Sequence, residues 1–287
     1  MAVHLIPSPS SPLLAKPYPI LPGQNLSAPY LQRPPIFWWN DPIQSIDQMR
    51  PGARIPWVGA TRARGTPAGL GSDCTANDQG IRGTAPTHIN GLIPCTLVVV
   101  FWQVATPSSH GRYFGVTYTS TDTGSVYQYC IQTTSTPDQI QLAWNSAGTA
   151  RVQNGTGGLP SNGALHTIVW THAAASHIVY LDGISGGEDT NAASAPTYVT
   201  PQVCIGTWTS DVTTRNPGAV ILDARIYDYI WTAQQARQFS DAALRWSLYP
   251  SLDDLPSCFL GRDISSPTQF APPNTLRPWA FTPGLAR

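Results

Sequence analysis

Residues that could carry out acid–base chemistry are few in this chain. Glu188 is its single glutamate, and Asp253 and Asp254 are adjacent, so on a strand their side chains would point to opposite faces. Hydrolysis of a glycosidic bond needs two carboxyl groups facing each other across the bond, one as the acid and one as the nucleophile or base. No such pair is recognisable, and the sequence therefore predicts a protein that is not an enzyme.

Two other catalytic patterns also lack their context. Residues 183–187 read Gly-Ile-Ser-Gly-Gly and match G-x-S-x-G, but a nucleophile elbow needs a helix directly after the serine, and the following residues indicate a loop. A phosphate-binding G-x-x-x-x-G-K-[ST] loop is absent, and Lys16 is the only lysine of the chain. We therefore expect neither a nucleotide site nor a cofactor.

Metal binding is a possibility raised by histidines and aspartates. His166, His172 and His177 fall within twelve residues around one predicted hairpin, but they sit at different points of its strands, which favours edge or surface histidines over a metal site. Aspartates in predicted loops could instead bind calcium at the rim of the fold, although ordinary turn residues are the competing interpretation. These weak calcium candidates are Asp122, Asp182, Asp189 and Asp211.

Aromatic side chains could stack on a sugar ring. Trp144, Tyr198 and Trp208 are of the right type, but in a stacked-sheet protein such residues also pack the core or the rim. Binding of a glycan stays an open alternative at this point.

Composition narrows the classes of partner. The chain has 287 residues, of which only 11% are charged, and its 16 basic and 16 acidic residues give a formal net charge of zero. Charge-driven binding of nucleic acid is therefore excluded, as is binding to an anionic membrane surface. No apolar run approaches the ~18 residues of a membrane span, and the N-terminus has no basic start typical of an exported protein. The five cysteines are widely spaced with no C-x-x-C, which favours buried free thiols.

Prolines divide the chain into three parts. Residues 1–94 contain 15 of the 28 prolines, residues 250–287 contain 7, and the 155 residues between contain 6. Because proline cannot donate to a β-ladder, we expect two extended arms, 1–94 and 250–287, around a folded domain at 95–249. Large aromatic residues in the arms predict anchors that lie on another surface: Phe37, Trp38, Trp39, Trp57, Trp279 and Phe281.

The middle part shows the pattern of an all-β domain. Short apolar runs separated by polar turn residues predict about nine strands. Those that can be placed are 95–104, 112–119, 124–132, 139–144, 165–171, 177–181, 203–208 and 219–229. Thr232 and Gln235 form a capping-box pattern that predicts one helix. The expected fold is a two-sheet antiparallel jelly-roll sandwich with one short C-terminal helix, flanked by extended Pro-rich arms.

The region 95–249 resembles a laminin-G-like, concanavalin A-like jelly roll. A strand ending in W-T, a hairpin with Y-x-D-G, an I-G strand and a G-x-I-x-D-x-R-I-Y-D strand precede a helix in that family. They correspond here to Trp170-Thr171, Tyr180–Gly183, Ile205-Gly206, residues 218–228 and the helix opened by Thr232. Residues 246–250 are also similar to the segment that follows this helix in phage relatives.

The resemblance implies a scaffold or a binding domain. In the phage relatives such domains are parts of virions, so we expect a structural virion protein, foremost a capsid decoration protein whose arms bind the major capsid protein or other virion subunits. Analogy with decoration proteins makes a homo-oligomer, and among these a trimer, the expected assembly, and the virion is the expected location. The alternative is a carbohydrate-binding adhesion module on a virion spike or tail. The two differ in where the arms go: onto neighbouring subunits, or back onto their own domain.

Overall fold

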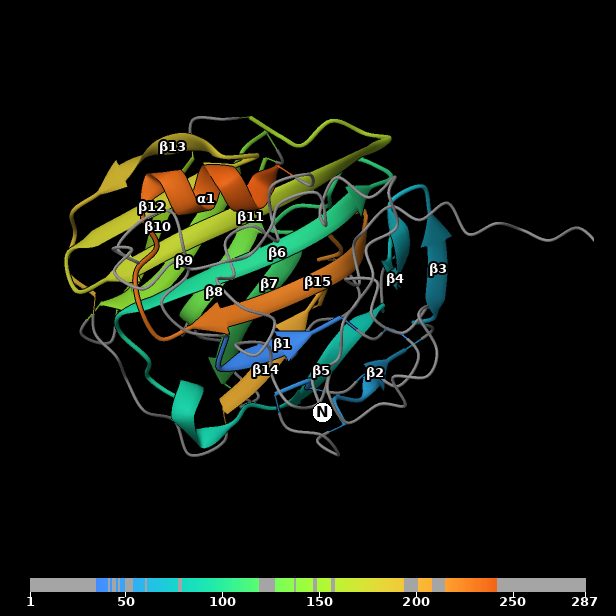
Figure 1. The fold of residues 1–287 in the computed structure, drawn as a ribbon, viewed down its shortest axis with the longest axis horizontal. Coiled ribbons are helices and arrows are strands. Elements are labelled where there is room, and N and C mark those ends of the chain that lie inside the picture. The colour runs from blue at the N-terminus through green and yellow to red at the C-terminus, as the bar shows by residue number, and fades with distance from the viewer. Residues whose placement is uncertain are drawn as a thin grey trace, which may run out of the picture.

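The computed structural model is a sandwich of two antiparallel β-sheets with one short α-helix (Figure 1). It describes residues 35–40, 42, 45, 47–49, 54–59, 61–76, 79–118, 127–136, 138–146, 149–155, 158–193, 201–207 and 215–241. The all-β prediction and the two-sheet architecture are confirmed.

The first sheet has eight strands within the described part of the chain. Its order is β13-β12-β11-β6-β15-β4-β3, and β1 pairs with β15 beside β4. The long neighbours β11, β6 and β15 form its centre. The bounds are β1 Phe37–Trp39, β3 Ala63–Thr66, β4 Gly69–Cys74, β6 Cys95–Gln103, β11 Ala164–Ala173, β12 Ser176–Leu181, β13 Ile184–Asp189 and β15 Ala219–Tyr227.

The second sheet has seven described strands in the order β10-β9-β8-β7-β14-β5-β2. Its bounds are β2 Trp57–Val58, β5 Gly80–Thr84, β7 Arg112–Tyr118, β8 Tyr127–Thr133, β9 Ile140–Ser146, β10 Thr149–Asn154 and β14 Pro201–Ile205. A 3-10 turn, η1 Thr87–Ile89, follows β5.

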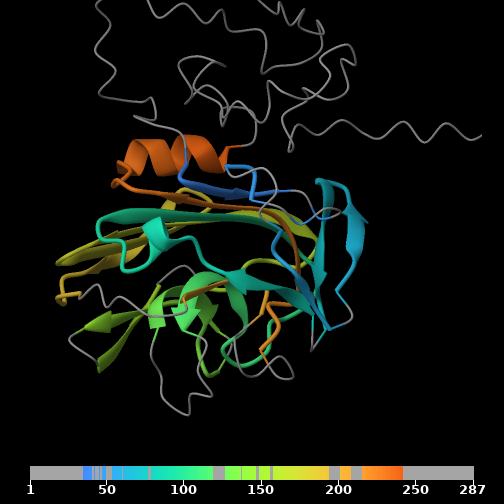
Figure 2. The same ribbon diagram turned by 90° about the horizontal axis from the view of Figure 1, so that it is seen from below.

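Figure 2 shows the two sheets as stacked layers. Alternating side chains of both sheets form the core between them. Leu97, Val99 and Phe101 of β6 lie in this core with Phe114 and Val116 of β7, all of them fully buried. Burial of such side chains contributes about 1.5–3 kcal/mol each, which makes this layer the main source of stability. Cys74, Cys95, Cys130 and Cys204 are buried and free, as the cysteine spacing predicts.

The prediction of an extended arm over residues 1–94 is wrong for residues 37–84. This segment supplies strands to both sheets, β1, β3 and β4 to one and β2 and β5 to the other. The prolines fall between these short strands, where no ladder hydrogen bond is required of them. The boundary predicted between residues 94 and 95 therefore lies inside the sandwich. The predicted arm 250–287 and residues 1–34 lie outside the described residues.

The helix α1 (Ala233–Ser240) begins at the predicted capping box. The backbone N–H of Gln235 donates to the Thr232 hydroxyl over 3.2 Å, and the Thr232 N–H donates to the Gln235 side chain over 2.8 Å. Figure 1 shows α1 lying across β11 and β12, and Figure 2 shows it on the outer side of the eight-stranded sheet. Ala236 and Phe239 are buried on that sheet, beside Trp231.

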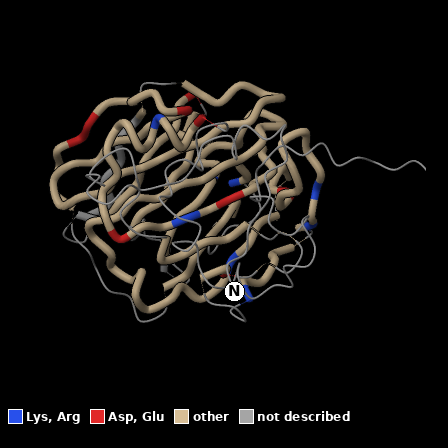
Figure 3. The backbone as a smooth tube through the Cα atoms, viewed as in Figure 1, with Lys and Arg blue, Asp and Glu red and all other residues tan. Residues whose placement is uncertain are grey.

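A buried ion pair also lies in the eight-stranded sheet. Arg225 donates from Nε to Asp223 Oδ1 over 2.8 Å, and both side chains are fully buried. The guanidinium carbon lies 4.1 Å from the centre of the Trp38 ring and 5.0 Å from that of Phe239. The pair therefore links β15, β1 and α1. Charged residues are sparse along the described backbone (Figure 3).

The strands predicted for the middle part are confirmed, with ends shifted by a few residues. Within this middle part, the strands β10 and β13 were not predicted. Residues 184–189, expected as a loop, form the edge strand β13 and not a helix, so the G-x-S-x-G match is no nucleophile elbow. Among the described residues, no helix is long and apolar enough to cross a membrane.

Candidate functional site

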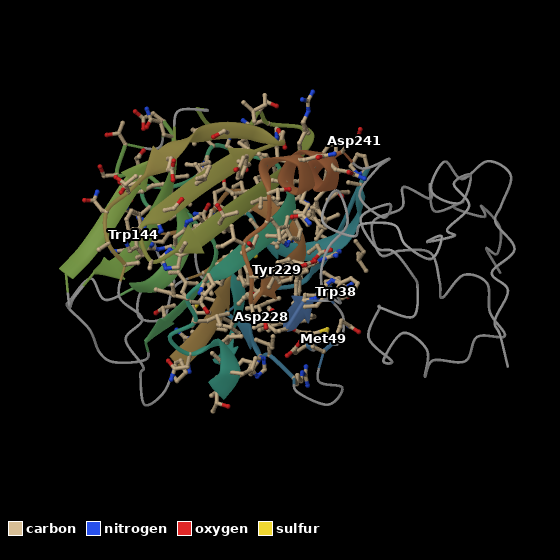
Figure 4. The ribbon with its side chains drawn as sticks, turned by 60° about the vertical axis from the view of Figure 1, so that its left-hand side comes forward. Trp38, Met49, Trp144, Asp228, Tyr229 and Asp241 are labelled. Atoms are coloured by element: carbon tan, nitrogen blue, oxygen red, sulfur yellow. The ribbon has the colours of Figure 1, made fainter. Side chains whose placement is uncertain are left out.

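An open polar groove lies between the β12–β13 turn and α1. It has a volume of about 400 Å3. Every residue that lines it carries a hydrogen-bonding side chain: Asp182, Gln234, Arg237, Gln238, Ser240 and Asp241. Figure 4 shows Asp241 at one end of α1, well separated from Trp144 at the other side of the sandwich.

The turn side of the groove is a tight hairpin. Leu181 pairs with Ile184, which leaves Asp182 and Gly183 as a two-residue loop with φ of 51° and 80°. Positive φ at both positions is the geometry of a type I′ turn, which favours Asp-Gly. A Cβ atom at Gly183 would lie 2.7 Å from the Cα of Arg237, so glycine lets the turn pack directly against the helix.

The helix side of the groove follows from periodicity. Gln234, Arg237, Gln238 and Asp241 are spaced i, i+3, i+4 and i+7 and therefore share one face of α1 and its C-terminal cap. The opposite face buries Ala236 and Phe239. This polar stripe is present in the sequence, but periodic polar residues on a short helix ordinarily indicate only a solvated face.

His166 supports the groove from behind Asp182. The Nδ1 atom of His166 is 2.7 Å from Oδ2 of Asp182, and its Nε2 atom is 2.9 Å from the Ser161 carbonyl oxygen. The other carboxylate oxygen, Oδ1, accepts the Thr167 N–H over 2.8 Å. Burial alone would lower the pKa of His166, but the hydrogen bond and charge of Asp182 and the Ser161 carbonyl outweigh it and raise the pKa.

His172 of β11 and His177 of β12 form a buried pair next to the turn that joins these two strands. Their Nδ1 atoms are 2.8 Å apart, and Nε2 of His177 is 2.8 Å from the Asn191 carbonyl oxygen. Burial lowers the pKa of both, that of His172 strongly, and the charge of His177 lowers the pKa of His172 further. The edge or surface placement predicted for the three histidines is wrong, because all three are buried.

Aromatic rings enclose the His172–His177 pair. The Trp144 ring centre is 4.2 Å from that of His177, and the Trp170 ring centre is 4.7 Å from that of His172. Trp144, proposed from its type as a sugar-stacking residue, is fully buried and cannot present a face to a ligand. Tyr198 and Trp208 lie outside the described residues.

The calcium candidates do not converge. Asp182 and Asp189 lie at opposite ends of β13, and Asp189 accepts hydrogen bonds from the backbone and side chain of Asn191. Asp122 and Asp211 lie outside the described residues. Within the part of the chain that the structure describes, no group of three or more histidine, cysteine or acidic side chains could hold a metal ion.

The aromatic residues predicted as partner anchors are mostly internal. Phe37 and Trp39 are fully buried in the inter-sheet core, and Trp38 is fully buried on the outer side of the eight-stranded sheet. Alternating orientation along β1 explains this split. Trp57 is 36% exposed. Trp279 and Phe281 lie outside the described residues, so no structural role is given to them.

Two carboxylates line the groove, and no sequence pattern predicted that they would lie near each other. Asp182 and Asp241 both line it, and both are exposed. A general acid in glycoside hydrolysis needs a carboxyl group whose charged form is disfavoured by burial. Asp182 is instead exposed, and its carboxylate accepts hydrogen bonds from His166 and from the Thr167 N–H.

No family model matches the chain, and no curated protein matches it. Solved structures share its fold. Domain 4 of AbnA, a GH43 extracellular arabinanase from Geobacillus stearothermophilus, in complex with arabinotriose, is 14% identical with a TM-score of 0.56, covering 73% of this chain and 99% of that domain.

Two further solved structures are similar at low identity. A Trypanosoma rangeli sialidase is 14% identical with a TM-score of 0.52, over 79% of this chain and 36% of the sialidase. The binding domain of botulinum neurotoxin DC, in complex with rat synaptotagmin II, is 9% identical with a TM-score of 0.50, over 73% of this chain and 51% of that domain. These likenesses show that the chain shares a β-sandwich fold with these structures.

Proposed function

We propose that this protein is a non-enzymatic glycan-binding module that holds a short saccharide in the groove between the β12–β13 turn and α1. The observation that carries the proposal is the groove itself: a volume of about 400 Å3 whose six lining residues each carry a hydrogen-bonding group. Sites for small molecules occupy roughly 300–1,000 Å3, so this volume suits one or two sugar rings.

The lining matches the chemistry of sugar hydroxyls, which both donate and accept. The carboxylates of Asp182 and Asp241 accept hydrogen bonds, the guanidinium of Arg237 donates them, and the amides of Gln234 and Gln238 do both. Hydrogen bonds to charged groups contribute about 1.5–3 kcal/mol each, more than neutral ones. A saccharide with neighbouring hydroxyls can therefore engage both walls of the groove at once.

The structural comparisons support this proposal through one solved complex. The arabinanase domain, whose fold this chain shares, is described in complex with arabinotriose. The absence of a recognisable acid–nucleophile pair in the sequence supports binding without hydrolysis, as does the exposure of both groove aspartates.

The course of the N-terminal segment bears on the alternative, a decoration protein that binds a virus shell through its arms. That interpretation expects Phe37, Trp38 and Trp39 to lie on neighbouring subunits. They pack instead inside their own sandwich, as expected for a module whose N-terminal segment folds back on its domain. Virion location, capsid partners and oligomeric state stay predictions from the resemblance.

A glycan array probed with the full chain, followed by calorimetry with the best-bound saccharide, tests the proposal. Arg237→Ala should weaken binding about tenfold, the loss of roughly one charged hydrogen bond. Arg62→Ala is the matched control, since it removes the same charge from a side chain that is 76% exposed and remote from the groove. Equal affinity for both variants, or no binding on the array, would refute the proposed site.

A further inference from the structure

The eight-stranded sheet ends in two edge strands that carry opposite charges. β13 forms one edge and β3 the other, and Figure 1 shows them at opposite sides of the molecule. The edge at β13 carries Glu188, which is exposed, followed by Asp189. At the edge formed by β3, the side chains of Arg62 and Arg64 are 76% and 41% exposed and share one carboxylate, Asp73, which is 2% exposed. One edge therefore presents negative charge to solvent, and the other presents positive charge.

The charges of both edges lie on the outer face of the sheet, the face that α1 covers. Residues that pair directly across antiparallel strands share a face. Glu188 pairs with Ile178, which packs against the buried cluster under α1. At the other edge, Cys74 points into the inter-sheet core, so Asp73, one residue earlier on β4, points to the outer face, where its two arginine partners meet it.

An exposed apolar side chain accompanies each charged edge, on the inner side of the sandwich. Ile184 of β13 is 72% exposed and pairs with Leu181, which packs against the inter-sheet core. Trp57 of β2 is 36% exposed and pairs with Ile81 of that core. β2 is an edge strand of the seven-stranded sheet, and Figure 1 shows it on the same side of the molecule as β3. Each of the two side chains therefore extends the core to an edge of the sandwich, at opposite sides.

We propose that these two edges bind each other between copies of this chain, with β13 of one copy beside β3 of the next. Edge strands offer backbone N–H and C=O groups to an added strand, and neither β13 nor β3 contains proline. When the eight-stranded sheets continue from copy to copy, outer face meets outer face and inner face meets inner face. This arrangement brings Glu188 toward Arg64, and Ile184 toward Trp57.

The same charges disfavour pairing of like edges. Two β13 strands would bring the acidic side chains of both copies together, and two β3 strands would bring their arginines together, and like charges across strands are destabilising. Binding between unlike edges leaves each assembly with one further edge of each kind, so association continues beyond a dimer into a row or a closed ring. None of these residues lines the groove, so the inference does not depend on the proposed function.

Sedimentation velocity of the full chain over a range of concentrations tests the assembly. The mean mass should rise with concentration past that of a dimer. A chain that stays monomeric, or one whose mass stops at that of a dimer, overturns the inference.

A charge exchange tests the pairing of unlike edges. Glu188→Arg makes both edges basic and Arg64→Glu makes both acidic, so each variant alone should dissociate about tenfold more readily or worse. An equimolar mixture should assemble again, because basic-edged and acidic-edged copies can alternate. Asp138→Arg, a charge reversal at an exposed position between the inner strands β8 and β9, is the control and should associate like wild type. A mixture that stays monomeric although circular dichroism shows both variants folded overturns the inference.

The apolar contact provides a test that does not alter charge. Ile184→Ser changes a side chain that is mostly exposed, so the fold should be retained while association weakens about tenfold. Ile230→Ser is the matched control, because Ile230 is also exposed but follows β15 and belongs to neither edge strand. Equal association of the two variants overturns the inference.

Discussion

The two ends of the β11–β12 hairpin place the same residue type in opposite electrostatic settings. His166 and His172 lie six residues apart on β11 and therefore point to the same face of the sheet. One faces a carboxylate and a carbonyl, the other faces a second histidine. Burial lowers the pKa at all three histidines; at His166 the Asp182 carboxylate and the Ser161 carbonyl outweigh it, whereas at His172 a second histidine adds to it.

Tautomers at the His172–His177 end follow from the acceptors. Because the Asn191 carbonyl only accepts, His177 must carry its proton on Nε2, which leaves its Nδ1 lone pair to accept from Nδ1–H of His172. Nε2 of His172 is then an unprotonated acceptor that is buried without a protein partner. The pKa of both histidines is lowered at this end, whereas contact with Asp182 raises the pKa of His166 at the other end.

Lowering the pH should have the largest effect, a loss of unfolding free energy that arises at the His172–His177 end. The folded-state pKa values of His172 and His177 are lowered, so between neutral pH and about pH 5 the unfolded chain, with histidine pKa near 6.5, takes up protons that the folded chain refuses. Their contribution to stability is thus complete above pH 6.5 and is lost as pH falls. We expect about 2–4 kcal/mol of this loss between pH 7.5 and 4.5, measured by urea unfolding.

A double variant isolates that loss from the titration of carboxylates. His172→Phe with His177→Phe replaces both partners of the pair by apolar rings and also removes the hydrogen bond of His177 to the Asn191 carbonyl, so it should cost about 1 kcal/mol at pH 7.5. The double variant should keep the stability that wild type loses in acid. Parallel pH curves for the two proteins would show that the pair is not the source.

The contact between the turn and α1 should give the next largest effect. Gly183→Ala places a side chain at φ of 80° and a Cβ 2.7 Å from the Arg237 Cα, so it should destabilise by about 2 kcal/mol and open the groove. Gly187→Ala is the control, since its φ of 104° carries similar strain but its Cβ would meet no atom within 4 Å. Equal losses of unfolding free energy in both variants would mean that the helix contact contributes nothing.

Sequence patterns predicted the elements of this region better than their assembly. Asp182-Gly183 predicted the turn and Thr232 with Gln235 predicted the helix start, because both signals are local. The groove needs the turn and α1, about fifty residues apart, to pack together, and no local pattern encodes that contact. The Phe37–Trp39 strand was misread for the same reason: its partner, β15, lies almost two hundred residues away.

Raising the pH should cause a smaller loss of unfolding free energy, which arises at His166. Its folded-state pKa is raised, so its contribution is fully present below pH 6.5 and is lost as pH rises through the folded value. Because Asp182 is 42% exposed and solvent screens the pair, we expect about 1 kcal/mol. His166→Gln should lose this alkaline dependence in urea unfolding while retaining the acid dependence of wild type. Loss of both would show that the two ends are one coupled unit.

Removal of the Glu188 charge should have the smallest effect, on the pKa of His177. This exposed glutamate of β13 accepts from the Ser176 hydroxyl over 2.5 Å, and its charge raises the pKa of His177 against the larger effect of burial. Glu188→Gln should lower the folded-state pKa of His177 further and cost a few tenths of a kcal/mol of stability near pH 5. Ser176→Ala, which removes the hydrogen bond but keeps the charge, is the control. Because salt at 1 M screens charges beyond about 3 Å, the difference between Glu188→Gln and wild type should vanish there, and its persistence would assign the effect to packing of β13 instead of charge.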